Sequence, residues 1–250
     1  MRRSTALALA GGLLALAIAC LLSLMVGART VSPTTVVEAL RSPDGTLADH
    51  AVIHARLLRT VAGVAVGAAL AVAGAAMQGM SRNPLADPGI LGINAGATTA
   101  VVIGVYLADA SRVAEFMVLA LLGAALGTVA VYTVASLGRE GATPVKLALA
   151  GAALTAGLGS VVNGLVMVDD SSLDRLRFWQ VGTLGARSLP DIAAVGALMV
   201  LGALAILVCT GVLNALALGD DAAVGLGVPV ARTRVLLGIA IILLCGAAVA

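Results

Sequence analysis

Seven apolar stretches, each close to the length that crosses a lipid bilayer, limit what this chain can fold into. A helix spans the hydrocarbon core of a bilayer with about 20 apolar residues. The stretches that approach this length are residues 7–27, 60–80, 89–108, 113–137, 145–168, 189–213 and 235–250. They lack the alternation of apolar and polar residues that marks a membrane β-strand. The sequence therefore predicts an all-α, polytopic helical membrane protein.

The composition excludes a soluble domain. Of the 250 residues, 60% are hydrophobic and 11% are charged, whereas a soluble domain of this length needs a far more polar surface. The sequence shows no soluble appendage, internal repeat or linker between the spans. We therefore predict one membrane domain over residues 1–250, surrounded by lipid, and we expect no nucleic-acid partner.

The charges near the N-terminus indicate an orientation. Arg2 and Arg3 precede the first apolar stretch and predict a cytoplasmic N-terminus. If seven spans then alternate, the loops near 81–88, 138–146 and 214–234 face the cytoplasm. When all 15 Lys and Arg residues are counted, seven fall inside and eight outside, so their overall distribution does not decide the orientation.

Both ends of the chain leave an alternative open. Residues 26–28 resemble a signal-peptide cleavage site, but the apolar run exceeds the usual core of about 7–15 residues, which favours a retained helix. The last apolar stretch stops at Ala250 without a polar flank. A helix ending there would leave carbonyl groups unpaired in lipid, so we expect this chain to be part of a longer protein.

A stiff polar stretch with two prolines, MQGMSRNPLADPGILGINAG, occupies residues 77–96. Pro84 disfavours helical geometry at Asn83, so the second span should end there. Asp87 and Pro88 have the pattern of an N-cap followed by a first-turn proline, which would restart the next helix. Leu85 lies between the two prolines. On these residues alone, a simple helix–turn–helix connector explains the stretch.

A second unusual stretch, LNALALGDDAAVGLGVPVARTR, occupies residues 213–234. Residues 213–218 can form a short helix that Gly219 ends in a left-handed turn. Asp220 can cap a second short helix, which Gly227 and Pro229 stop. Two apolar-faced short helices at the cytoplasmic surface favour docking on another protein. The alternative is a helix pair lying on lipid, although the scarcity of basic residues makes that attraction weak.

Small residues recur every four positions on three spans. Gly67, Ala71, Ala75 and Gly79 lie on the second span, and Gly123 and Gly127 form a GxxxG pair on the fourth. We expect both stripes to pack against neighbouring helices. The stripe on the fifth span is partly polar, and it either packs or lines a transport pathway. Its members are Gly151, Thr155, Gly159 and Asn163.

The outside loops carry three further signals. Ser32 as N-cap and Pro33 at the first helical position predict a short surface helix. Arg56 and Arg59 share one helical face just before the second span, where they either snorkel at the membrane boundary or offer fixed charges to an acidic partner. The only tryptophan, Trp179, falls in the polar stretch 169–187 and suits the membrane interface.

Motifs for catalysis or metal binding are missing from the sequence. It contains no nucleotide phosphate loop, no HExxH and no GxSxG, so we predict a non-enzyme with no catalytic residues. Cys20, Cys209 and Cys245 fall in apolar stretches without metal-ligand spacing. His50 and His54 are four residues apart but have no accompanying ligands, so we expect no metal site. Any ATP used for transport would be bound by another chain.

Several of these stretches together resemble the FecCD family of ABC-transporter permeases, which includes iron–siderophore, haem and vitamin B12 importers. The similarity runs from about residue 50 to the end. Its segments are RLLRT at 56–60, VGAALA at 66–71, AGAAMQG at 73–79, NPLADPG at 83–89, LGINAG at 91–96, LALGDDAA at 216–223 and LGV at 226–228. The chain departs from the family at Leu58, which replaces a proline, and at Val224 and Gly225, where relatives are often polar.

The resemblance implies a type II ABC importer permease in the bacterial cell membrane. It implies a second permease subunit, a pair of ATPase subunits that hold ATP and Mg, an extracytoplasmic substrate-binding protein, and a metal-chelate substrate. It also implies three further spans, which this chain does not include. The roles it implies are binding-protein docking by Arg56 and Arg59, a cytoplasmic gate at Asn83, Pro84 and Leu85, a pathway lined by the fifth span, and ATPase coupling by Leu216, Leu218, Gly219, Asp220, Asp221, Ala222, Leu226 and Gly227.

The main alternative is a secondary transporter or channel driven by an ion gradient. Such proteins usually carry ionisable residues at the middle of the membrane. In this sequence the acidic residues cluster at span ends and in loops, which favours the ATP-driven importer. The choice among siderophore, haem and cobalamin stays open at the level of sequence.

Overall fold

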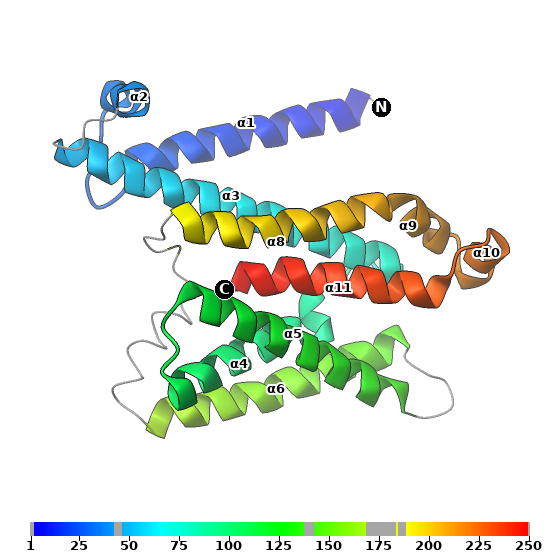
Figure 1. Ribbon diagram of the computed structural model, residues 1–250. Coiled ribbons are helices and arrows are strands. Elements are labelled where there is room, and N and C mark those ends of the chain that lie inside the picture. The colour runs from blue at the N-terminus through cyan, green and yellow to red at the C-terminus, as the bar shows by residue number, and fades with distance from the viewer. Residues whose placement is uncertain (1–2, 43–46, 138–142, 169–183, 185–188, 250) are drawn as a thin grey trace. The chain divides into compact units, whose positions relative to one another are not determined.

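The computed structural model describes residues 3–42, 47–137, 143–168, 184 and 189–249, and every regular element in these ranges is a helix (Figure 1). The predicted all-α class is thus confirmed. Trp179 and most of the polar stretch 169–187 lie outside the described residues.

Six of the described helices are long and apolar enough to cross a membrane. They are α1 (Arg3–Met25), α3 (Ala48–Ser81), α5 (Val113–Ser136), α6 (Pro144–Val168), α8 (Leu189–Val208) and α11 (Val230–Val249). The third of the seven predicted spans differs. A 3-10 turn, η1 (Pro88–Leu91), takes its first residues, and α4 (Ile93–Ala108) keeps 16 residues.

The described residues group into two compact units, and α3 begins in one and ends in the other. The first unit comprises residues 1–64 with 184–189. Its core is a small apolar cluster between α1, the short helix α2 (Pro33–Arg41) and the first half of α3. The members with exposed fractions below one tenth are Leu24, Val31, Val36, Ala39 and Ile53.

Polar contacts in the first unit fix α1 and α2. Ser32 caps α2 as predicted, because its hydroxyl accepts the backbone N–H of Thr35 at 3.2 Å. The hydroxyls of Ser23 on α1 and Thr60 on α3 are 2.8 Å apart and form a hydrogen bond. Helix α1 is therefore attached to α3.

The second unit is built on glycine contacts between α4 and α5. A Cβ atom added at Gly96 would lie 2.2 Å from the carbonyl oxygen of Gly123, and one at Gly127 would lie 2.5 Å from that of Gly92. Only hydrogen at these positions lets the two backbones approach this closely. The GxxxG pair on α5 therefore packs as predicted, and it meets a second GxxxG pair, Gly92 and Gly96.

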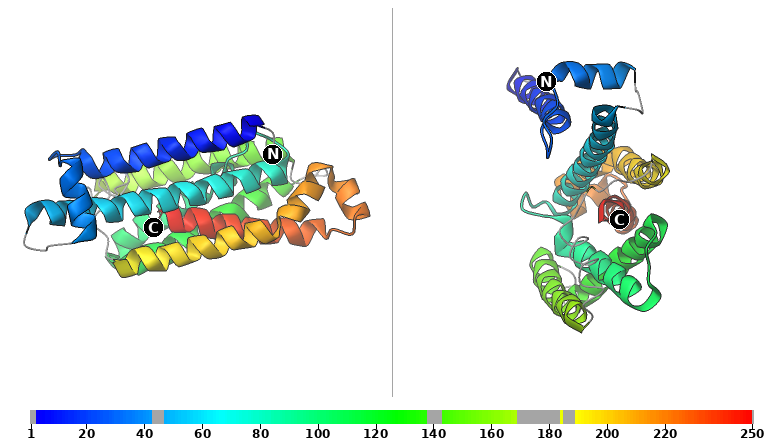
Figure 2. Two further views of the ribbon diagram at one scale, coloured as in Figure 1. Left: turned by 90° about the horizontal axis from the view of Figure 1, so that it is seen from above. Right: turned by 90° about the vertical axis from the view of Figure 1, so that its left-hand side faces the viewer.

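Helix α11 lies between α5 and α8, as the end-on view in Figure 2 shows. Gly246 on α11 faces Leu121 on α5, and Gly202 on α8 faces Leu244 on α11. The side chains of Leu237, Ile241 and Leu244 are fully buried. This arrangement gives the second unit an apolar core that holds the ends of its helices in place.

Among the described residues, the predicted packing stripe on α3 is wrong for three of its four members. Gly67, Ala71 and Ala75 are exposed, and only Gly79 meets another helix, through Leu213. The buried face of α3 is instead formed by Ala69, Ala73, Ala76 and Met77. The error has a physical reason: every face of this helix carries small residues, so spacing alone does not identify the packed face.

Candidate functional site

The proline-containing turn begins where α3 ends. Helix α3 stops at Ser81, and Arg82 adopts a left-handed conformation with φ 53°. The N–H of Asn83 donates to the carbonyl of Gln78 at 3.3 Å, the bond expected of a Schellman ending. The predicted end of the span near Asn83 is therefore confirmed, with an arginine at the position that glycine usually occupies.

Asn83 also organises the turn that follows. Its side-chain oxygen accepts the N–H of Leu85 at 2.9 Å, and its carbonyl accepts the N–H of Ala86 at 3.0 Å. Leu85 between the two prolines is 83% exposed, whereas Ala86 is buried. The turn is thus compact in its backbone and projects one large apolar side chain.

Asp87 acts as an N-cap, as predicted, but the helix it starts is short. Its carboxylate accepts the N–H of Gly89 at 2.7 Å, and Pro88 is the first residue of η1. Gly92 then takes a left-handed conformation with φ 69°, and α4 starts at Ile93. The predicted continuous span from residue 89 is wrong because this glycine separates the 3-10 turn from the α-helix.

Two short helices follow α8. They are α9 (Thr210–Ala217), which begins three residues earlier than predicted, and α10 (Asp220–Gly225). Gly219 separates the two helices with a positive φ of 113°, as expected. With its ψ of 156°, however, the conformation is extended and not left-handed helical. Gly227, with φ 80°, ends the pair as predicted.

Asp220 does not cap α10. Gly219 is the N-cap residue, and Asp220 is the first residue of the helix. Its carboxylate binds Arg234 instead, with the Nη2 atom of Arg234 at 3.0 Å from Oδ1 and 2.9 Å from Oδ2. The carboxylate thus bonds the neighbouring helix α11 and makes no side-chain cap bond to α10.

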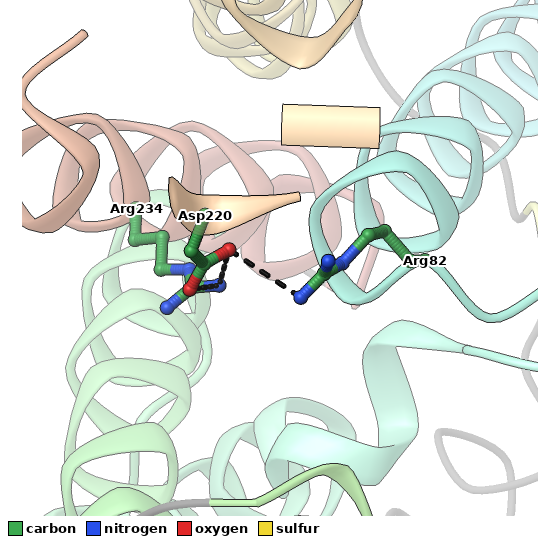
Figure 3. A network of polar contacts seen from close by, with 3 residues as sticks. All are labelled: Arg82, Asp220 and Arg234. Carbon is green, nitrogen blue, oxygen red and sulfur yellow. Dashed lines mark hydrogen bonds and ion pairs between the residues drawn. The ribbon is translucent and has the colours of Figure 1, made fainter. Parts of the chain in front are cut away.

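Arg82 is the second partner of Asp220, and its Nη2 atom lies 3.4 Å from Oδ1 (Figure 3). The three side chains come from the end of α3, the start of α10 and the start of α11. They remain 40–46% exposed. We refer to Arg82, Asp220 and Arg234 as the arginine–aspartate cluster. Sequence reasoning missed it, although all three of its residues lie in loops predicted to be cytoplasmic.

The α9–α10 pair has an anchored face and an exposed face. Leu216 is 1% exposed and Ala223 is fully buried, so each short helix fixes one side chain in the core. On the other face Leu218 is 71% exposed, Val224 62% and Leu226 66%. Asp221 and Ala222 are exposed as well. The predicted coupling residues thus fall into two groups: buried residues that anchor the two helices in the core, and exposed residues on their outer face.

Arg56 and Arg59, which the sequence pairs, have different environments. Arg56 is half-buried, and its guanidinium donates to the carbonyl of Leu24 at 2.9 Å and to that of Arg29. Arg59 is exposed, and its Nε donates to the carbonyl of Leu184 at 3.2 Å. Arg56 therefore holds the end of α1, whereas Arg59 leaves more of its charge accessible.

The four residues of the stripe on α6 do not share one environment. Gly151 is buried, and a Cβ atom there would lie 2.0 Å from the carbonyl oxygen of Ile90 in η1. Thr155 and Asn163 are exposed, and a Cβ atom at Gly159 would meet nothing within 4 Å. Gly151 packs, and the other three form an open, weakly polar face. Within the described ranges no three His, Cys, Asp or Glu residues are grouped to hold a metal ion.

These features define a class of protein. It is a polytopic helical membrane protein with a proline turn and two short helices between its spans, and with an open, weakly polar face on α6. The fold matches a solved structure described as an inward-facing metal-chelate type ABC transporter, with a TM-score of 0.75 and 22% sequence identity. The match covers 96% of this chain and 72% of that one. At this identity the likeness shows the fold alone.

The sequence comparisons identify the family. The model of the FecCD transport family matches residues 13–250, and the chain belongs to that family. The ferric enterobactin transport system permease protein FepD of Escherichia coli K12 is 42% identical over 249 residues, covering 98% of this chain and 73% of the relative. The Fe(3+)-citrate import system permease protein YfmD of Bacillus subtilis 168 is 40% identical over 229 residues, covering 92% and 68%.

Proposed function

We propose that this chain is the membrane permease of an ATP-driven importer for an iron–siderophore or related metal chelate. Membership of the FecCD transport family supports this function, as do its relatives, which include permeases for ferric enterobactin and Fe(3+)-citrate. The proposed location is the bacterial cell membrane, with the N-terminus in the cytoplasm. The proposed partners are two ATPase subunits that hold ATP and Mg, a second permease subunit, and an extracytoplasmic binding protein.

The exposed apolar face of α9–α10 carries the proposal. Leu218, Val224 and Leu226 project outward while Leu216 and Ala223 hold the two helices in the core. An apolar face on short, firmly anchored helices suits insertion into a groove of another protein. Attachment to anionic lipid is less suited to this surface, because Asp220 and Asp221 lie at the start of α10. The ATPase pair is therefore the proposed occupant.

The proline turn and α6 are the proposed gate and pathway. The turn at Asn83–Leu85 holds its shape through hydrogen bonds of its own, so it can move as a unit when its neighbours move. Leu85 is the side chain with which such a gate would close. Thr155, Gly159 and Asn163 offer a weakly polar surface of small side chains for a bulky chelate. Gly151 lets α6 pack closely against η1.

Arg59 is the better of the two candidates for docking the binding protein. Its side chain is exposed, whereas the guanidinium of Arg56 is occupied by two backbone carbonyls. A fixed surface charge mainly speeds encounter and sets orientation. We therefore assign docking to Arg59 and support of the docking surface to Arg56.

Charge substitutions on the exposed face of α9–α10 test the proposal. In the intact transporter, Leu218→Glu and Leu226→Glu should abolish co-purification of the ATPase. Bulky residues at Gly219, Asp220 and Asp221 should do the same by displacing α10, which these residues start. Leu40→Glu on the surface helix α2 is the matched control, since Leu40 is also an exposed leucine on a short helix. Undiminished co-purification of the Leu218 and Leu226 variants would contradict the assignment.

The energy source can be tested separately. Uptake of the chelate should disappear when the ATPase is inactivated and should persist for a short time when an uncoupler dissipates the ion gradient. Uptake that survives loss of the ATPase and stops with the uncoupler would instead show a secondary transporter.

A further inference from the structure

We propose that Asp220 is a positioning residue that links the ATPase-binding helices to the gate turn, and that it does not itself contact the ATPase. This inference rests on the proposed function, because it concerns how movement passes between two of its parts. Asp220 lies at the first position of α10, and Arg82 lies directly before Asn83 of the turn. The carboxylate therefore joins two segments that are 138 residues apart in sequence.

The two contacts of the carboxylate are unequal. Arg234 approaches both oxygens at 2.9 and 3.0 Å, whereas Arg82 approaches one oxygen at 3.4 Å. Charge-assisted hydrogen bonds are strongest near 2.7–2.9 Å and weaken with distance. Arg234 thus holds α10 on α11, and Arg82 forms the weaker contact, which can break and re-form while α10 stays attached.

The backbone of Arg82 gives independent support. Its φ of 53° is a conformation that glycine adopts without strain and that a residue with a Cβ atom adopts at a cost. An arginine costs more than glycine at this position, and its side chain supplies a contact with Asp220 that glycine cannot make. That side chain reaches α10: a Cβ atom on Gly219 would lie 3.5 Å from its Nη1 atom.

A second contact joins the same segments. Leu213 on α9 lies 3.3 Å from the position of a Cβ atom on Gly79, within the last turns of α3. Both short helices therefore touch the end of α3, one through apolar packing and one through the arginine–aspartate cluster. A displacement of α9–α10 is transmitted to the residues that precede the gate.

The exposure of the cluster suits a contact that changes during a cycle. Its side chains are 40–46% exposed, and ion pairs with such access to water add little to stability. Breaking the Arg82 contact therefore costs little, since water replaces the lost partner. A buried pair would be difficult to open, because each charge would be left without a partner.

Exposed charges outside the proposed binding surfaces provide a matched test. Glu38 on α2 and Arg232 beside Arg234 are both exposed, so Asp220→Asn and Arg234→Gln can be compared with Glu38→Gln and Arg232→Gln. In the assembled transporter, Asp220→Asn should keep the ATPase bound and lower transport per ATP hydrolysed about threefold to tenfold. The double variant Asp220→Asn/Arg234→Gln should be no worse than the poorer single variant. The two control variants should retain full coupling.

Arg82→Gly separates coupling from stability. Glycine relaxes the backbone at this position, so the melting temperature should hold or rise. The guanidinium is lost, so coupling should fall as in Asp220→Asn. With Leu85→Cys as a reporter in a chain whose three natural cysteines are replaced by alanine, nucleotide should change the labelling of residue 85 in the parent and leave it unchanged in Arg82→Gly.

The outcomes separate this inference from the proposed function. If Asp220→Asn loses the ATPase, Asp220 is a docking residue and the inference fails, while the importer assignment stands. Normal coupling in Arg82→Gly would also overturn the inference. If the parent protein itself does not bind the ATPase, the proposed function fails.

Discussion

The helix pairs α4–α5 and α9–α10 differ in how their two helices are joined. The first pair is joined by backbone-to-backbone contact at Gly92, Gly96, Gly123 and Gly127, which leaves no room for a single added carbon. The second is joined by Gly219 in an extended conformation with positive φ, and it presents large apolar side chains outward. Close backbone packing builds a fixed scaffold, whereas anchored helices joined by a flexible residue type suit a part that moves.

The two pairs also differ in how polar groups are used. Glu115 at the start of α5 accepts the N–H groups of Ser111 and Arg112 at 2.9 and 3.0 Å, so its carboxylate serves its own helix. Asp220 at the start of α10 serves α11 and the end of α3 instead. A local cap stabilises one helix, whereas a carboxylate shared between segments couples them.

The largest expected effect is at the glycine contact of the scaffold. Gly123→Val places methyl groups against the backbone of Gly96, which side-chain movement does not relieve, so unfolding should become easier by about 3 kcal/mol or more. The control Gly157→Val has nothing within 4 Å of its Cβ position and should change stability by less than about 0.5 kcal/mol. Thermal unfolding in detergent measures both. Equal melting temperatures would show that the scaffold is not tightly packed.

Two leucines of the α9–α10 pair should give effects of different kinds. Leu216→Ala removes a buried side chain and should cost about 2–4 kcal/mol of stability. Leu218→Ala changes an exposed side chain and should cost less than about 0.5 kcal/mol while weakening ATPase binding. Melting temperature and ATPase co-purification, measured on both variants, separate anchoring from presentation. A stability loss of the same size at Leu218 would remove the distinction.

The same division between support and presentation predicts different effects for Arg56 and Arg59. Arg56→Ala leaves the carbonyl of Leu24 without its donor and should cost roughly 1–2 kcal/mol of stability. Arg59→Ala should leave stability nearly unchanged and should slow association with the binding protein, most strongly at low salt. Association rates of the parent and of Arg59→Ala, measured at two ionic strengths, test this. If the ratio of the two rates does not change with salt, the result counts against docking through the charge of Arg59.

The smallest expected effect is at the cap of α2, a short helix that can be compared with α10. Ser32→Ala removes the hydroxyl that accepts the N–H of Thr35 and should cost about 1 kcal/mol or less. Ser32→Asp retains an acceptor and should restore most of that loss. Unfolding measurements on both variants decide whether α2 depends on its side-chain cap. Helix α10 has no such cap, because its N-cap residue is Gly219.

The sequence predicts those parts of the fold that depend on local chemistry. The length of the apolar stretches predicts the spans, and the positions of Ser32, Asp87 and Gly227 predict where short elements begin or end. The GxxxG pair on α5 is likewise a local pattern, and it packs as expected. These predictions succeed because the residues concerned act on their own backbone or through a recurrent packing mode.

Features that depend on distant parts of the chain escape such reasoning. The stripe on α3 fails because small residues surround that helix, so only its neighbours decide which face is buried. The assignment of Asp220 as a cap fails because two arginines, one of them 138 residues away, bind its carboxylate. Arg56 and Arg59 are equivalent in sequence and become different only when the carbonyls of residues 24 and 29 are in place.

Arg82 leads to a consequence for the evolution of this protein. A laboratory selection that rewards only heat resistance should replace this arginine by glycine, since the helix then ends without strain. Growth on a scarce chelate should reverse the change, because survival would then depend on nutrient delivery. The two selections would pull one codon in opposite directions.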